Sequence, residues 1–164
     1  MNSSYNLENE NECNFWDWKG FKIFWSVKGK ENKTPIILLH GFGASSKHWR
    51  YNSNYFAKKG YSVYSLDLIG FGKSAQPGIG EIGKLDNGVW CNQVNDFIQH
   101  VIRPKTSNKI ILIGNSLGSL VALTCAVYLK NEILSVIASP LPDPLVIYKK
   151  KSKLNLFFKK FKKG

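Results

Sequence analysis

A serine stands between two glycines in the stretch Gly114-Asn115-Ser116-Leu117-Gly118, which has the pattern G-x-S-x-G. Such a serine can act as a nucleophile when it lies at the tip of a sharp turn between a strand and a helix. Side chains two residues before and after it would collide with that strand and helix, so both positions require glycine. The positive end of the following helix favours a developing oxyanion. The spacing therefore predicts a nucleophilic serine, and an ordinary helix N-cap is the alternative role for Ser116.

Apolar segments flank this pattern as such a turn requires. Short continuous apolar runs are typical of strands that are buried on both faces of a parallel sheet, whereas apolar residues three and four apart indicate helices. The expected strands cover residues 35–39, 61–66, 109–113 and 133–138, and the expected helices cover residues 46–59, 87–103 and 117–130. Strands thus alternate with helices from residue 35 onward. This alternation predicts an α/β fold with a mostly parallel sheet and helices on both faces.

Aromatic and polar residues alternate over residues 15–27, around Gly20. This pattern predicts a β-hairpin or two short strands. The three tryptophans of this segment could form a ligand surface, but packing against the edge of the sheet is the favoured interpretation.

Three glycine-rich or polar segments follow three of the predicted strands. They are residues 40–43, residues 67–74 and Ser116. The carboxyl ends of parallel strands meet at one edge of the sheet, where α/β proteins bind their ligands. We therefore expect these segments to converge at one site.

Together these three segments resemble the α/β-hydrolase superfamily. The resemblance rests on residues 38–43, residues 66–74 and residues 114–118, and it covers roughly residues 15–140. The Trp-x-Trp start, the Gly-Asn-Ser-Leu-Gly elbow and the proline-rich residues 140–144 are most similar to hydrolases of cyanobacteria and plastids, near the pheophytinase and chlorophyll dephytylase group. The resemblance implies a partial α/β-hydrolase fold that lacks its C-terminal strands, and hydrolysis of an ester.

The resemblance also implies roles for individual residues. Ser116 would be the nucleophile, and the backbone N–H groups of Phe42 and Leu117 would form the oxyanion hole. The residues that would shape the oxyanion loop and the elbow are His40, Gly41, Gly43, Gly114 and Gly118. His40 would be structural and would not serve as the catalytic base, and Asp67 would order the loop that follows it.

The chain has no histidine after Ser116, although the family places its histidine last, after the serine and the acid. His48 and His100 lie on predicted helices, where packing or solvated roles are expected. Asp143 is a candidate acid because it follows the strand at 133–138. A serine without a base is a poor nucleophile at neutral pH, so we expect a truncated member of the family with little or no activity.

The chain has 164 residues, of which 43% are hydrophobic, and a formal net charge of +12. Residues 149–163 contain eight lysines and no acid, so the other residues carry only +4. The charge thus belongs to one segment, and we predict no nucleic-acid partner. The three cysteines have no metal spacing and indicate reduced thiols in a cytoplasmic protein. A G-x-G-x-x-G match at 78–83 lies in a loop, so no cofactor is predicted and no metal either.

The C-terminal residues place apolar side chains among the lysines with helical spacing. The apolar residues are Leu154, Phe157, Phe158 and Phe161. We expect residues 1–14 to be disordered, residues 15–140 to form the hydrolase core and residues 141–164 to begin a lid. A basic amphipathic helix can pack over a site or contact an anionic membrane, and both roles would suit a small apolar ester as substrate. The alternative function is a non-catalytic protein that binds a membrane or partner through this tail.

Overall fold

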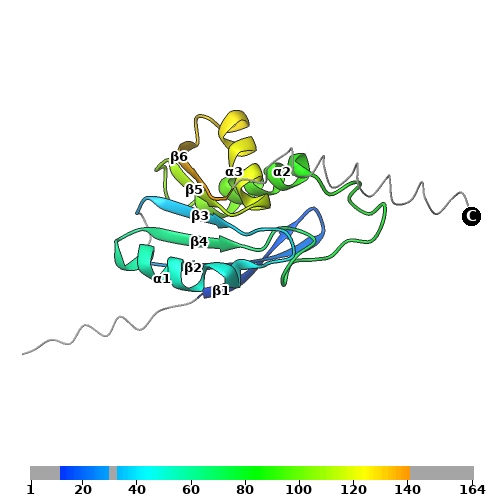
Figure 1. Ribbon diagram of the computed structural model, residues 1–164, viewed down its shortest axis with the longest axis horizontal. Helices are drawn as coiled ribbons and strands as arrows, with labels where there is room; N and C mark the ends of the chain where they lie inside the picture. Colours follow the sequence, from blue (N-terminus) through cyan, green and yellow to red (C-terminus); the bar gives the residue numbers. More distant parts are fainter. Residues whose placement is uncertain (1–11, 30–32, 141–164) are drawn as a thin grey trace, which may run out of the picture.

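A computed structural model describes residues 12–29 and 33–140. Its elements, in chain order, are β1 (Glu12–Trp18), β2 (Phe21–Lys28), β3 (Pro35–Leu39), the 3-10 helix η1 (Ser46–Trp49), α1 (Arg50–Lys58), β4 (Ser62–Leu66), α2 (Asn87–Phe97), the π-helix η2 (Ile98–Ile102), β5 (Ile110–Gly114), α3 (Leu117–Tyr128) and β6 (Ile133–Ala138). The strands form one six-stranded sheet (Figure 1).

The sheet has the strand order β1-β2-β4-β3-β5-β6. The pairs β1–β2 and β2–β4 are antiparallel, and the pairs from β4 through β3 and β5 to β6 are parallel. α1 covers one face, and α2 and α3 cover the other (Figure 1). The predicted α/β fold with a mostly parallel sheet and helices on both faces is therefore confirmed.

The buried strands have the apolar composition that two covered faces require. Every residue of β3 and β4 is buried. Alternate side chains of each strand enter a large core under α2 and α3 or a smaller core under α1, which includes Trp49 and Val63. The sheet is thus held between two apolar layers, and this fixes the positions of its strand ends.

The N-terminal hairpin turns at Lys19 and Gly20, which have φ values of 55° and 82°. Two left-handed residues form the turn that matches the twist of paired strands. Trp18 is buried and donates from Nε1 to Asp96 Oδ2 at 2.8 Å, and Trp16 packs on Phe97. The hairpin and the packing role of these tryptophans are therefore confirmed.

Some boundaries differ from the sequence expectations. β1 already begins at Glu12, inside the segment expected to be disordered, because Cys13 and Asn14 pair with Ser26 and Trp25 of β2. The helix expected at 46–59 begins with the 3-10 turn η1, and the helix expected at 87–103 ends in the π-turn η2. Residues 1–11 and 141–164 lie outside the described residues.

Candidate active site

Ser116 lies at the tip of the turn between β5 and α3. Its backbone has φ 52° and ψ −112°, a conformation that L-residues rarely adopt. Its N–H donates to the carbonyl oxygen of Pro140 at 3.0 Å, which ties the turn to the end of β6. Strain of this kind persists only when surrounding contacts fix the backbone. The structure therefore holds Ser116 in the conformation expected of a nucleophile elbow.

The two glycines that flank the elbow allow backbone to contact backbone. A Cβ atom added at Gly114 would lie 2.3 Å from the carbonyl oxygen of Gly118. A Cβ atom added at Gly118 would lie 2.1 Å from the carbonyl oxygen of Leu39 on β3. Both distances are far below van der Waals contact, so both positions require glycine for the reason inferred from the sequence.

The loop after β3 lies directly against the elbow. A Cβ atom added at Gly41 would lie 3.4 Å from Ser116 Cβ and 3.0 Å from Asn115 Oδ1. Asn115 N–H donates to the carbonyl oxygen of Leu39 at 3.0 Å. The N–H groups of Phe42 and Leu117 donate to no described residue. Neither N–H group is thus used by another described residue, and Leu117 directly follows Ser116 in the chain.

His40 joins the loop after β3 to the loop after β4. The side chain is buried, with Nδ1 2.8 Å from the carbonyl oxygen of Gly41, and Nε2 accepts from Leu68 N–H at 3.1 Å. Nδ1 therefore carries the proton that is donated to Gly41. Burial lowers the pKa of His40, which keeps the ring neutral. Because both nitrogens are engaged in backbone contacts, His40 is placed as a structural residue.

Asp67 orders the loop that follows β4. Its buried carboxylate accepts from Ser46 N–H at 2.5 Å and from Lys73 N–H at 2.7 Å. Gly72 lies so close that an added Cβ would be 2.1 Å from Asp67 Oδ2. The carboxylate thus organises the loops after β3 and β4 through backbone donors.

The other two histidines make their contacts with other residues than Ser116. His100 is exposed, stacks on Trp16 and has Nδ1 2.8 Å from the carbonyl oxygen of Asp96. His48 is exposed and contacts the ring of Trp49. No histidine in the described part of the chain is therefore placed to accept the Ser116 proton. Asp143, the candidate acid, lies outside the described residues.

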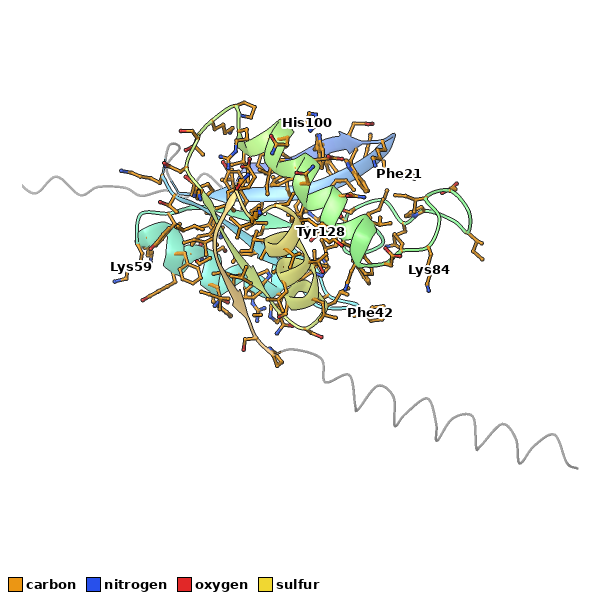
Figure 2. The ribbon with its side chains drawn as sticks, turned by 90° about the horizontal axis from the view of Figure 1, so that it is seen from above. Phe21, Phe42, Lys59, Lys84, His100 and Tyr128 are labelled. Carbon is orange, nitrogen blue, oxygen red and sulfur yellow. The ribbon has the colours of Figure 1, made fainter. Side chains whose placement is uncertain are left out.

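An aromatic wall beside the oxyanion loop was not anticipated from the sequence. Phe42 and Phe71 have ring centroids 5.3 Å apart, and Phe71 and Trp90 have centroids 6.0 Å apart. Phe42 is 79% exposed and projects from the surface, as Figure 2 shows. Phe71 stands inside the predicted glycine-rich loop, but only the folded chain reveals which ring it contacts. The wall gives this end of the sheet an apolar surface.

Two polar residues that support the site were also missed. Gln93 is fully buried on α2, accepts from Ile69 N–H at 3.0 Å and donates to the carbonyl oxygen of Asp67 at 3.2 Å. Ser119 Oγ donates to the carbonyl oxygen of Gly114 at 2.8 Å. A glutamine on the apolar face of a predicted helix was the available signal for Gln93.

The arrangement suits attack by Ser116 on a carbonyl whose developing oxyanion would be held by the two free N–H groups. Among residues 12–29 and 33–140, no group of three or more His, Cys, Asp or Glu side chains could hold a metal ion. No described helix is long and apolar enough to cross a membrane.

The chain is similar to known hydrolases in sequence and in fold. Epoxide hydrolase 4 of Mus musculus is 32% identical over 127 residues, which is 77% of this chain and 33% of that protein. Proline iminopeptidase of Clostridioides difficile is 30% identical over 86% of this chain and 47% of its own length. A bacterial membrane phospholipase A structure aligns with a TM-score of 0.69 at 26% identity, over 78% of this chain and 39% of that chain.

This chain spans less than half the length of each of these relatives. Residues 30–160 match the family described as serine aminopeptidase, S33. The match covers most of the chain, including β3, β5 and the elbow between β5 and α3. The chain therefore belongs to the serine aminopeptidase S33 family of the α/β-hydrolase superfamily.

Proposed function

We propose that this chain carries the nucleophile and the oxyanion hole of a serine hydrolase that acts on an ester of an apolar molecule. The observation that carries the proposal is the position of Ser116, at the strained tip of the elbow beside the free N–H groups of Phe42 and Leu117. The aromatic wall that includes Phe71 supports an apolar substrate. We also propose that, within the superfamily, the chain is related to the pheophytinase and chlorophyll dephytylase group.

The reaction would proceed in two steps. Ser116 Oγ forms a bond to the ester carbonyl carbon, its proton passes to a base, and the tetrahedral oxyanion accepts bonds from the two N–H groups. The C–O bond then breaks, and the alcohol leaves with a proton. Water attacks the acyl-enzyme and releases the carboxylic acid and free Ser116.

The base must come from outside the described histidines. Each of His40, His48 and His100 is engaged elsewhere, and the sequence has no histidine after Ser116. We therefore expect the 164-residue chain to hydrolyse esters slowly at neutral pH, and a longer polypeptide or a partner that supplies a histidine to restore activity.

Hydrolysis of p-nitrophenyl butyrate by the 164-residue chain, and by any longer product of its gene, tests the proposal. In an active form, Ser116→Ala should lower kcat/KM by about 10⁴-fold. Ser135→Ala is the matched control, because Ser135 is exposed on β6. Ester hydrolysis that Ser116→Ala leaves unchanged would contradict the proposal. Rapid Ser116-dependent hydrolysis by the 164-residue chain would contradict only the need for an added base.

A non-catalytic role is the second candidate. It is favoured by the missing histidine and by the eight lysines within residues 149–163. In this proposal the chain is cytoplasmic, and its basic tail contacts anionic membranes. Sedimentation with phosphatidylserine vesicles would compare the whole chain with a form that ends at Pro140. Equal binding by the two forms would exclude the tail as the membrane contact.

A further inference from the structure

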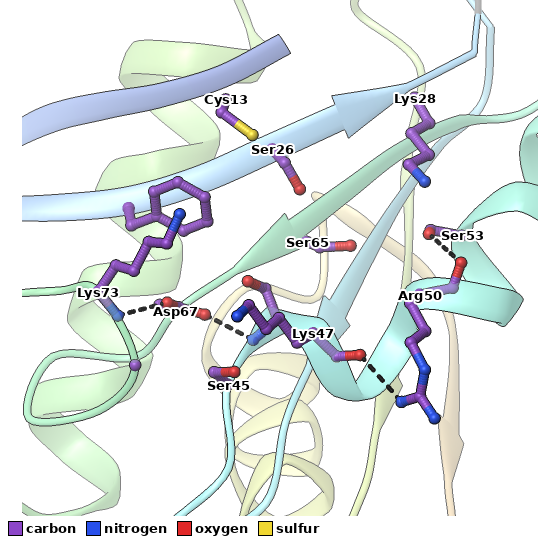
Figure 3. A pocket seen from close by; sticks show the side chains of 13 residues that line it. Cys13, Ser26, Lys28, Ser45, Lys47, Arg50, Ser53, Ser65, Asp67 and Lys73 are labelled. Carbon is purple, nitrogen blue, oxygen red and sulfur yellow. Dashed lines mark hydrogen bonds between the residues drawn. The ribbon is translucent and has the colours of Figure 1, made fainter. Parts of the chain in front are cut away.

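A cavity lies on the face of the sheet that α1 covers, and Ser116 does not line it. Its volume is about 460 Å³, which lies in the range of small-molecule sites. β2 and β4 form one wall, and η1 and the start of α1 form another (Figure 3). Nothing in the proposed hydrolase chemistry uses this space.

Two hydroxyl groups on adjacent strands point into the cavity. Ser26 of β2 and Ser65 of β4 are register partners, so their side chains share one face of the sheet. Both side chains line the open centre in Figure 3. Ser65 is only 4% exposed, and it lines the cavity. A hydroxyl group can both donate and accept hydrogen bonds, so Ser26 and Ser65 give this wall of the cavity two groups that can bind a polar ligand.

Cationic side chains surround these hydroxyls. The cavity is lined by Lys28, Lys47, Arg50 and Lys73, against the single carboxylate of Asp67. No described carboxylate forms an ion pair with any of these cations. The Asp67 oxygens already accept from the backbone, as described above. The cavity is therefore positively charged.

Part of the donor capacity of the cations is already used. Lys28 Nζ donates to Asn54 Oδ1 at 2.7 Å, and Lys73 Nζ lies 4.6 Å from the ring centroid of Phe24. An ammonium group has three N–H donors, so Lys28 keeps two after its bond to Asn54. Lys47 belongs to η1, on the wall that faces the strands. Ammonium groups on both walls can thus contact a ligand in the cavity.

We propose that this cavity binds a phosphate-bearing small molecule. Hydroxyl donors from two strands and ammonium groups from both walls match an anion with several acceptor oxygens and a charge near −2. Ser26 and Ser65 donate to the phosphate oxygens, and Lys28 and Lys47 balance the charge. The proposal stands independently of the chemistry at Ser116.

Titration of the ¹⁵N-labelled chain with glycerol 3-phosphate tests this proposal. Residue-resolved amide shifts are needed because the lysines of residues 149–163 can attract any anion. We expect saturable shifts at Ser26 and Ser65 at millimolar concentration, and no shifts with neutral glycerol. Ser65→Ala and Lys47→Gln should each weaken binding roughly tenfold. Lys59→Gln, on an exposed lysine outside the cavity that lies over Tyr55, should leave it unchanged.

The same titration with inorganic phosphate distinguishes the source of the anion. Tighter binding of glycerol 3-phosphate supports a phosphate monoester as the ligand, and equal binding supports free phosphate in the same cavity. Circular dichroism of Ser65→Ala checks that the variant folds, and Ser26→Ala provides a second test if it does not. Shifts confined to other residues, or equal affinity in the wild type, Ser65→Ala and Lys47→Gln, would overturn the proposal.

Discussion

The ring of His40 accepts a hydrogen bond from the backbone N–H of Leu68, with the two nitrogens 3.1 Å apart in the buried interior. The bond joins the ends of β3 and β4, which are neighbours in the sheet. On its other side the ring contacts the carbonyl oxygen of Gly41, which shares a peptide group with the N–H of Phe42, the proposed oxyanion donor. The position of that donor therefore depends on a neutral histidine.

This dependence predicts that acid destabilises the fold through His40. Its folded pKa lies below the ordinary value of 6.5, chiefly because burial disfavours the charged ring. The stabilisation by the neutral ring is fully present above pH 6.5 and is lost as the pH falls from 6.5 toward the folded pKa, because the unfolded chain takes up the proton first. Each pKa unit of lowering corresponds to about 1.4 kcal/mol.

Urea unfolding between pH 8 and pH 5 measures this effect. His40→Asn should unfold about 1–3 kcal/mol more easily at pH 8, where it leaves Leu68 N–H or Gly41 unsatisfied. It should also flatten the pH dependence below pH 6.5. His48→Gln is the control, since His48 is exposed. An equal slope in the wild type and His40→Asn would contradict the prediction.

The contact between Gly118 and Leu39 predicts a large cost for one methyl group. In Gly118→Ala the new Cβ would lie 2.1 Å from the carbonyl oxygen of Leu39, so α3 must move away from β3. We expect the free energy of unfolding to fall by about 3 kcal/mol or more. Gly43→Ala is the comparison: its Cβ meets nothing within 4 Å, and only its φ of +68° opposes the change. The free energy of unfolding of that variant should fall by only about 1 kcal/mol. Thermal unfolding would show which of the two variants is less stable.

The backbone of Ser116 predicts that function and stability oppose each other at this position. Ser116→Gly removes the steric strain at φ 52°, whereas Ser116→Ala keeps it. Both changes delete the hydroxyl, so their difference isolates the backbone. We expect the glycine variant to be more stable than the alanine variant by about 1 kcal/mol in chemical denaturation. This is the net effect, because the relief of strain is partly offset by the higher conformational entropy of glycine in the unfolded chain. A less stable glycine variant would show that the turn is unstrained.

The three thiols should differ sharply in reactivity. Cys13 is exposed, whereas Cys91 and Cys125 are buried with their sulfur atoms 3.5 Å apart. The hydrogen bond with Cys91, together with burial, raises the pKa of Cys125, which disfavours its reactive thiolate. Ellman's reagent should therefore modify one thiol in the folded chain. It should modify all three in guanidinium chloride at ~6 M, which unfolds the chain. Cys13→Ser should abolish the fast reaction, and a fast reaction in that variant would contradict the burial of the pair.

Much of this arrangement could be predicted from sequence because local rules determine it. Apolar runs identified the parallel strands, and the need for glycine at an elbow identified Gly114 and Gly118. The convergence of the loops after β3, β4 and β5 followed from parallel strands ending at one edge. The contacts of Gly41 with Ser116 and of His40 with Leu68 confirm that convergence.

The contacts that could not be predicted join residues far apart in the chain. Gln93 binds the backbone at Asp67 and Ile69 only because α2 packs over the end of β4. The cavity around Ser65 depends on the separation between the sheet and η1, and no local pattern encodes that separation. The polar residues before Phe15 favour disorder when the sequence is considered alone, but pairing with β2 extends β1 back to Glu12.

At the elbow, backbone atoms pack directly against backbone atoms: Gly118 lies against Leu39, and Gly114 lies against Gly118. Side-chain volumes in the surrounding core do not set these spacings. In a laboratory evolution experiment, the core side chains beneath α3 could therefore exchange for others of similar volume while the serine stayed in register with its loop. The position of Ser116 Oγ thus does not depend on which apolar side chains fill the core. Many core sequences are therefore compatible with the same site geometry.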